Sequence, residues 1–357
     1  MEINMNPNLL NTRRHKSLRF VSIFLTLVML MDITALTSGC TVPIKFPVSV
    51  TGYKLNTYVT LSAYASGNHS ADELNNILNE ALALCDTYEL LFSRTDSRST
   101  LYKVNTGECT NISKELAELI NIGIEYGRIS QGAFDISIGS VSSLWDFTAD
   151  KPSVPDDAAI KNALQYVDYT KIQLSQCNDG TFNINIPEGM ILDLGAIAKG
   201  YIADRIRDFF LENGIDRAII NLGGNVLCIG SKNSASDFTI GIKKPFANDN
   251  ATLVNLSLAD KSAVSSGTYE RYFKEGDRLY HHILNPATGY PYDNELCAVT
   301  IISDLSVTGD CLSTTCFALG VDKGLSLIET LENVEAVFVT NDGQTHYSSG
   351  FEGYIKK

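Results

Sequence analysis

The stretch from Arg217 to Ser303 constrains the fold most strongly, because short apolar runs follow one another there with turns rather than helices between them. Runs rich in Val, Ile, Leu and Thr that are bounded by Gly, Pro, Asn and Asp are typical of β-strands. The runs are RAIINLGGNVLCIGS, DFTIGIKKP, TLVNLSL, AVSSGTYERYF, HHILNP and LCAVTIIS. Because strands joined by hairpins pair antiparallel, the sequence predicts an α+β fold with mixed, largely antiparallel sheets rather than a doubly wound sheet.

Helical patterns precede this region. HSADELNNILNEALALCDTYELLF places a capping box at Ser70 and Glu73 before leucines at helical spacing, which predicts a long amphipathic helix. Ser113 is expected to cap a second helix, and a short helix is expected near 157–166. MILDLGAIAKGYIADRI is expected to pass from a strand into a helix.

The N-terminus has the pattern of an export signal. Four basic residues between Arg13 and Arg19 precede a long apolar run that ends in small residues. A membrane anchor helix is the alternative, but Asp32 interrupts the apolar run. The predicted organisation is a signal peptide at 1–39, a tether at 40–50 and a single domain at 51–357.

The segment LTSGC resembles the lipobox of bacterial lipoproteins, in which a Cys after a small residue is lipidated. Cys40 fits that position, although Leu36 lies one place earlier than usual and Thr37 stands where Leu is expected. This resemblance implies an extracytoplasmic protein anchored to the bacterial cell membrane. An ordinary cleaved signal that leaves Cys40 free is the alternative.

The acidic balance narrows the possible ligands. The net charge is −13, and removal of the basic N-terminus would make the chain more acidic. This disfavours nucleic acid and anionic membrane surfaces as partners, and a site for phosphates would need a metal or local positive dipoles. The common phosphate-binding loops, HExxH and GxSxG are absent from the sequence.

Four stretches carry more glycine and polar residues than packing requires: QGAFDISIGSVSSLWDF, LDLGAIAKGYIADRI, SAVSSGTYERYFKEGDRLYHHILNPATGYP and TGDCLSTTCFALG. In the second, Asp193 precedes a helix start rich in small residues, where an anion could bind, and Lys199 adds a charge. Asp193 could equally be the N-cap of that helix.

The third and fourth stretches offer a base and a metal site. Ser265, Ser266 and Gly267 could surround a ligand, and His282 is either a base or a hydrogen-bonding surface residue. Asp310, expected to open its helix, shares a face with Thr314, and their oxygens suit Mg²⁺. The alternative for Asp310 is the cap of a buried helix.

The four stretches occur in an order that resembles the ApbE family, the FAD:protein FMN transferases. INLGGNVLCIG and FSRTDSRSTLYKVN also match, and the resemblance covers about residues 50–345. It implies an ApbE-like architecture, related to the T-fold, and an enzyme that uses Mg²⁺ to move the FMN half of FAD onto a Thr or Ser of a target flavoprotein, releasing AMP.

The resemblance also implies residue roles. The metal would be held by the Ala196 carbonyl, Asp310 and Thr314, with Ser313 standing where some members have a second Asp. Thr95 falls where members have an aromatic residue, and Leu55 where many have Met. The FAD contacts carried over are Leu55, Thr95, Ala133, Phe134, Asp135, Asp193, Lys199, Ser266, Gly267 and Ile283.

His282 matches the family's motif histidine and is expected to be the catalytic base, whereas His281 has no assigned role. The acceptor is expected to carry a [D/S]-G-A-[T/S] motif in a membrane or extracytoplasmic electron-transfer subunit. Three other functions stay open: hydrolysis of FAD to FMN and AMP, storage of FAD by a non-catalytic lipoprotein, and solute binding. The hairpin-linked strands disfavour the last of these.

Overall fold

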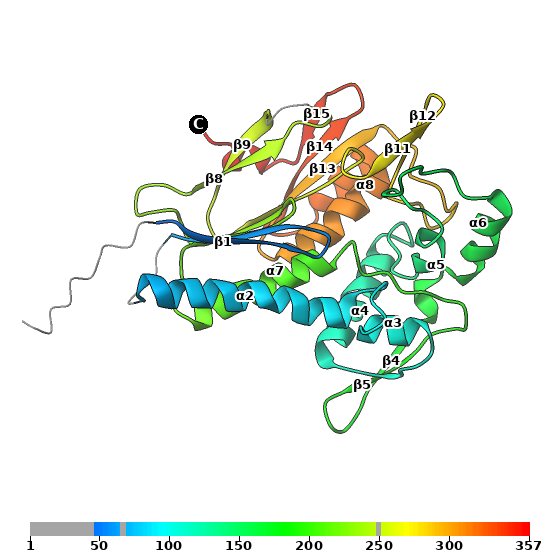
Figure 1. Cartoon of the computed structure of the whole chain (residues 1–357). Helices are drawn as coiled ribbons and strands as arrows, with labels where there is room; N and C mark the ends of the chain where they lie inside the picture. The colour runs from blue at the N-terminus through cyan, green and yellow to red at the C-terminus, as the bar shows by residue number, and fades with distance from the viewer. Residues whose placement is uncertain (1–45, 65–68, 248–250) are drawn as a thin grey trace, which may run out of the picture. The chain divides into compact units, whose positions relative to one another are not determined.

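The computed structural model describes residues 46–64, 69–247 and 251–357, and Figure 1 shows their arrangement. Residues 46–357 form one compact unit. The expected signal peptide and Cys40 lie outside the described residues. The tether expected at 40–50 overlaps strand β1, which begins at Val48, so residues 48–50 belong to a sheet.

An eight-stranded sheet forms the centre of the molecule, and every neighbouring pair in it is antiparallel. This confirms the predicted α+β class. The strand order is β1 (Val48–Lys54), β2 (Thr57–Ala63), β6 (Ala218–Leu222), β7 (Asn225–Ile229), β10 (Ser262–Gly267), β13 (Leu296–Ser303), β14 (Glu335–Thr340) and β15 (Thr345–Tyr347).

Three long helices, α2 (Ala71–Phe92), α7 (Ala198–Glu212) and α8 (Ser306–Ile328), pack on one face of this sheet. Val264 of β10 faces α8 at Gly309, whereas its neighbour Ala263 faces the opposite side. There it packs with the separate hairpin of β8 (Phe238–Lys243) and β9 (Thr252–Leu258). The molecule is therefore layered as helices, sheet and hairpin (Figure 1).

Smaller elements complete the fold. Two further small sheets are β3-β5-β4 and β11-β12. The bounds are α3 (Thr100–Asn105), β3 (Asn111–Ile112), α4 (Lys114–Ile129), α5 (Gly139–Ser142), α6 (Asp157–Ala163), η1 (Leu164–Tyr166), η2 (Tyr169–Lys171), β4 (Gln173–Gln176), β5 (Phe182–Asn185), β11 (Tyr272–Glu275), β12 (Arg278–His281) and η3 (Phe351–Tyr354).

Short sequence patterns correctly predicted where several helices and one hairpin turn begin. The capping box of Ser70 and Glu73 is present at the start of α2, and Ser113 accepts the N–H of Leu116 at the start of α4. The Gly223–Gly224 turn joins β6 to β7, and both glycines have positive φ. A Cβ on Gly223 would also lie 2.0 Å from the Thr57 hydroxyl, so only glycine fits there.

The strand expected at MILD does not form. Ile191 makes an isolated bridge to Ile138, and the Leu192 backbone bonds instead to the side-chain amide of Asn105, at 2.8 Å through its N–H and 2.9 Å through its carbonyl. HHILNP is not a strand either, because β12 ends at His281. In both places the backbone N–H and carbonyl groups that would pair with a neighbouring strand bond to side chains or within turns instead.

Helix α8 begins at Ser306, four residues before Asp310. The carboxylate of Asp204 on α7 accepts the backbone N–H groups of Ser306 (2.9 Å) and Val307 (3.0 Å), which supplies the helix with a cap from outside its own sequence. By length and composition α8 is apolar enough to cross a membrane, but most of it is buried, as in a core helix.

Candidate functional site

Asp310 is buried in the first turns of α8, with 5% of its surface exposed. Its Oδ2 accepts the backbone N–H of Gly200 at 2.6 Å, and its Oδ1 accepts the side-chain amide of Asn225 at 2.9 Å. Burial raises the pKa of this carboxyl. Asp310 is therefore not the N-cap of its helix, because its carboxylate is directed at α7 and β7 instead.

Three hydroxyls lie close to one another, and one of them bonds to the backbone of Asp310. The Oγ atoms of Ser266 and Ser313 are 2.8 Å apart, and the Ser266 Oγ is 3.4 Å from Oγ1 of Thr314. Ser313 also donates to the backbone carbonyl of Asp310 at 3.0 Å. The fold thus brings three of the expected site residues from β10 and α8 into one cluster of oxygens.

This donor set fits a hard divalent cation. Asp310 makes no salt bridge among the described residues, and the nearest cationic influence on its carboxylate is the charge of Lys199. Mg²⁺ prefers oxygen ligands and binds through one or two carboxylates plus substrate phosphates. Ala196, whose carbonyl is the remaining expected ligand, is exposed two residues before α7. No cluster of three or more His, Cys, Asp or Glu side chains occurs in the described ranges, so hydroxyls, carbonyls or the substrate would complete the set.

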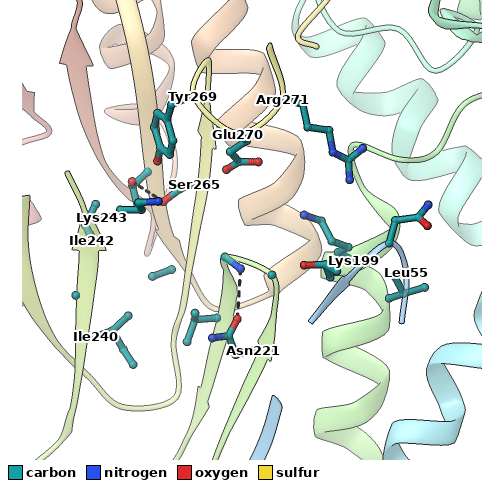
Figure 2. Close-up of a pocket in the computed structure, with 18 residues that line it drawn as sticks. Leu55, Lys199, Asn221, Ile240, Ile242, Lys243, Ser265, Tyr269, Glu270 and Arg271 are labelled. Atoms are coloured by element: carbon teal, nitrogen blue, oxygen red, sulfur yellow. Dashed lines mark hydrogen bonds between the residues drawn. The ribbon is translucent and has the colours of Figure 1, made fainter. Parts of the chain in front are cut away.

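A cavity of about 520 Å³ opens between the central sheet and β8, and Lys199 in its lining is electrostatically coupled to Asp310. Figure 2 shows Lys199 and Leu55 on one side, β8 on the other, and Glu270 and Arg271 above them. It is lined by Leu55, Asn56, Thr57, Lys199, Asn221, Gly223, Gly224, Val226, Ile240, Gly241, Ile242, Lys243, Ala263, Ser265, Tyr269, Glu270, Arg271 and Thr300.

Folding gathers three basic residues around this cavity, of which the sequence analysis had singled out only Lys199. Lys199, Lys243 and Arg271 come from α7, β8 and the segment before β11, and Glu270 is the acidic residue beside them. Lys199 is electrostatically coupled to Asp310, Glu270 and His282. An otherwise acidic protein can therefore receive an anionic ligand here.

The two histidines have different environments. His281 is buried, its Nε2 lies 3.0 Å from the Tyr292 carbonyl, and its Nδ1 accepts the N–H of Ile283 at 3.3 Å. These two bonds place the proton on Nε2 and hold the chain around the turn. Burial lowers the pKa of His281 to about 4. His281, which had no expected role, is a structural residue.

His282 lies next to the cavity, because its backbone N–H donates to the Arg271 carbonyl at 3.2 Å. The Nδ1 atom of its ring is buried without a hydrogen-bond partner among the described residues. Burial, followed by the charge of Arg271, lowers the pKa of His282 to about 3. The ring is therefore neutral at physiological pH and has a nitrogen free to bond a substrate group.

Asp193 is not the cap of α7, whose N-cap is Ile197. Its carboxylate accepts from the Arg94 guanidinium at 3.2 Å, the Ser142 hydroxyl at 2.8 Å and the N–H of Gly195 at 2.9 Å. Asp193 therefore fixes the loop that leads to Ala196. Arg94, which the sequence did not single out, neutralises it.

The loop Ala133–Asp135 is tied down by its own hydrogen bonds. Asp135 accepts from the N–H and hydroxyl of Ser137 and from the N–H of Tyr169, and burial raises its pKa. The Ala133 carbonyl accepts the Tyr292 hydroxyl at 2.8 Å, which links this loop to the histidine turn.

The expected FAD contacts fall into three groups. Leu55 and Lys199 line the cavity, with Leu55 in the β1–β2 turn at a φ of 53°. Ser266 belongs to the oxygen cluster on the opposite face of β10 from Ser265. The other expected contacts do not line the cavity; Phe134, Asp135, Gly267 and Ile283 are buried, and Thr95 is exposed.

The sequence analysis missed Asn225, Glu270 and Arg271. Asn225 was visible as a polar residue inside the apolar run INLGGNVLCIG, which is a signal for a buried hydrogen bond. Glu270 and Arg271 follow the serine pair after three residues and resemble an ordinary surface turn, and no local pattern indicated that they line the same cavity as Lys199.

The fold and the site together define an α+β protein with an oxygen-rich metal-type site at the edge of a cation-lined cavity. Residues 55–338 match the model of the ApbE family. The chain is 39% identical over 279 residues to an FAD:protein FMN transferase of Klebsiella pneumoniae (76% of this chain, 86% of that protein). It is 32% identical over 304 residues to one of Treponema pallidum (80% and 83%).

Solved structures agree with this match. The fold superimposes on the crystal structure of the ApbE protein of Thermotoga maritima with a TM-score of 0.78 and 28% identity, over 87% of this chain and 100% of that one. The chain belongs to the ApbE family.

Proposed function

We propose that this chain transfers the FMN moiety of FAD to a Thr or Ser hydroxyl of a target flavoprotein, with the help of Mg²⁺, and releases AMP. Its similarity to FAD:protein FMN transferases supports the reaction. One observation assigns this reaction to a site: the buried carboxylate of Asp310 makes no salt bridge, lies near a cluster of three hydroxyls, and is electrostatically coupled to Lys199, which lines the cationic cavity.

The reaction breaks one phosphoanhydride bond and forms one phosphoester bond. The acceptor oxygen attacks the phosphorus on the FMN side, the bond to the AMP phosphate breaks, and the hydroxyl proton passes to a base. Such phosphoryl transfer depends chiefly on positioning and charge neutralisation. Lys199 and Arg271 line the cavity where they can neutralise phosphate oxygens.

Asp310, Thr314 and the Ala196 carbonyl would hold the Mg²⁺, and Ser313 would offer a further hydroxyl oxygen. A bound Mg²⁺ would neutralise charge that develops on the leaving phosphate. Gly200 and Asn225 hold the Asp310 carboxylate in place, so its orientation is fixed before the metal arrives.

His282 is the proposed base for the acceptor hydroxyl. A base must be unprotonated before it acts, and the lowered pKa keeps the ring neutral. Its free Nδ1 and its place beside Arg271 support this role. Bound phosphates would raise the basicity of the ring, because their negative charge stabilises the imidazolium.

The sequence supports a location outside the cytoplasm, with lipidated Cys40 as the anchor to the bacterial membrane. The targets would then be membrane or extracytoplasmic electron-transfer subunits that carry a [D/S]-G-A-[T/S] motif. The net charge of −13 disfavours nucleic acid as a partner.

One experiment tests this function against its alternatives. The mature protein is mixed with FAD, Mg²⁺ and a target domain that carries the motif, and flavin fluorescence is read in a denaturing gel. Fluorescence at the mass of the target supports transfer. Free FMN and AMP with an unlabelled target would show hydrolysis, and tight FAD binding without turnover would show storage.

A further inference from the structure

Strand β8 has an edge without a partner. It pairs with β9 on one side, and no other described strand bonds to it. The hairpin is held against the central sheet by Phe238, Ile242 and Leu256, which pack with Ala263 in one apolar cluster. An open strand edge in a rigidly packed hairpin is a surface that can pair with another chain.

The hydrogen bonds of β9 show which backbone groups of β8 are free. Lys356 donates its N–H to the carbonyl of Asn255 at 2.8 Å, so this carbonyl points away from β8. Asn255 lies opposite Gly241, and the two therefore form a non-hydrogen-bonded pair. It follows that the N–H and carbonyl of Gly241 point to the open edge.

This edge faces the cavity. Four consecutive residues, Ile240–Lys243, line it, although successive side chains of a strand point to opposite faces. The strand therefore meets the cavity along its backbone edge (Figure 2). Lys199 and Arg271 line the same cavity, so the β8 edge is continuous with the reaction site.

We propose that the acceptor segment of the target protein binds as an added antiparallel or parallel strand along the open edge of β8. The inference rests on the proposed transfer, since only a protein acceptor requires such a groove. The reaction centre at Asp310 is buried, so an extended segment can reach it where a folded surface cannot. Backbone pairing supplies affinity that is independent of the segment's side chains.

One side-chain feature fits the same occupant. Lys243 is exposed at the cavity and favours an acidic side chain in the segment next to the acceptor hydroxyl.

The test compares Gly241→Pro with Gly241→Ala. Both variants add a Cβ, which would lie 2.6 Å from the Cγ2 of Thr252, but only proline removes the N–H that faces the cavity. We expect Gly241→Pro to raise the KM for the acceptor domain at least about tenfold relative to Gly241→Ala, as the loss of a backbone bond implies. The Kd for FAD should be the same in both variants.

Equal KM values in the two folded variants would overturn the proposal. Loss of FAD affinity in Gly241→Pro alone would also overturn it, because the edge would then contact FAD itself. Wild-type protein that transfers no flavin would refute the proposed function instead, so the two failures are distinguishable.

A second measurement needs no variant of this chain. Hydrogen exchange of the wild-type protein is followed with FAD and an acceptor whose target Thr is replaced by Val, so that the complex cannot react. Amides at 239–243 should become protected when this acceptor is added. Protection elsewhere with unchanged exchange at 239–243 would overturn the proposal even if the proline variant failed to fold.

Discussion

The backbone N–H of Gly200 donates a 2.6 Å hydrogen bond to Oδ2 of Asp310, across 110 residues of sequence. The amide belongs to the first turn of α7, where unpaired N–H groups and the helix dipole favour an anion. The anion at this helix start is thus a side chain of the protein. The close approach needs glycine, because a Cβ on residue 200 would lie 2.4 Å from the Ser306 carbonyl oxygen.

Gly200→Ala should therefore destabilise the protein. The clash is with backbone, which cannot rotate away, and overpacking of this kind costs about 1–3 kcal/mol. Chemical denaturation of the variant checks this. The matched control is Gly353→Ala, where an added Cβ would meet nothing within 4 Å. Equal unfolding free energies for the two variants would contradict the steric argument.

Asp310→Asn should abolish transfer and Mg²⁺ dependence together, while the protein stays folded. The substitution keeps the shape of the side chain but removes the charge that would bind the metal. A loss of about 100-fold or more is expected, since removal of groups that merely support a metal ligand costs about 10–100-fold. Activity at several Mg²⁺ concentrations is the measurement, and a fully active variant would exclude Asp310 as a ligand.

Asn225→Ala tests the group that orients this carboxylate. The variant loses the 2.9 Å bond to Oδ1 of Asp310 but keeps the charge. We expect the Mg²⁺ concentration for half-maximal activity to rise about tenfold, with partial recovery of transfer at saturating Mg²⁺. Asn225→Asp is not a suitable control, because it would place two carboxylates side by side. A variant with unchanged Mg²⁺ dependence would show that Asn225 is only structural.

His282→Gln should retain FAD binding and lose transfer, because it removes the base but leaves the cavity intact. His281→Gln should behave in the opposite way and lower the unfolding free energy by about 1–3 kcal/mol, since two buried bonds are disturbed. FAD titration, transfer rates and denaturation of both variants decide the assignment. Normal transfer by His282→Gln would rule out this residue as the base.

The stability difference between wild-type protein and His281→Gln should depend on pH. Burial lowers the pKa of His281 to about 4 in the folded protein, below its ordinary value near 6.5. Between these values the unfolded chain binds a proton that the folded protein does not, so stability is complete above pH 6.5 and falls as the pH drops. The difference should shrink by about 2 kcal/mol between pH 7 and pH 5. A constant difference would contradict a buried neutral ring.

Helix starts and turns that depend on contacts between residues a few positions apart could be predicted from the sequence. The caps at Ser70 and Ser113 use hydrogen bonds to the next turn, and the Gly223–Gly224 hairpin uses local backbone freedom. The hairpin-linked strands predicted the antiparallel class, and the order of the polar motifs predicted the family, since each of these signals is contained in a short segment.

Only the tertiary structure decided how these segments meet. Asp204, which lies on α7, caps the start of α8. The side chain of Asn105 bonds to the backbone of Leu192, where the sequence MILD had predicted a strand. Arg271 lines the same cavity as Lys199 because it follows β10, a strand of the sheet on which α7 packs. Such contacts depend on the packing of segments that are far apart in the chain, and no local pattern contains that information.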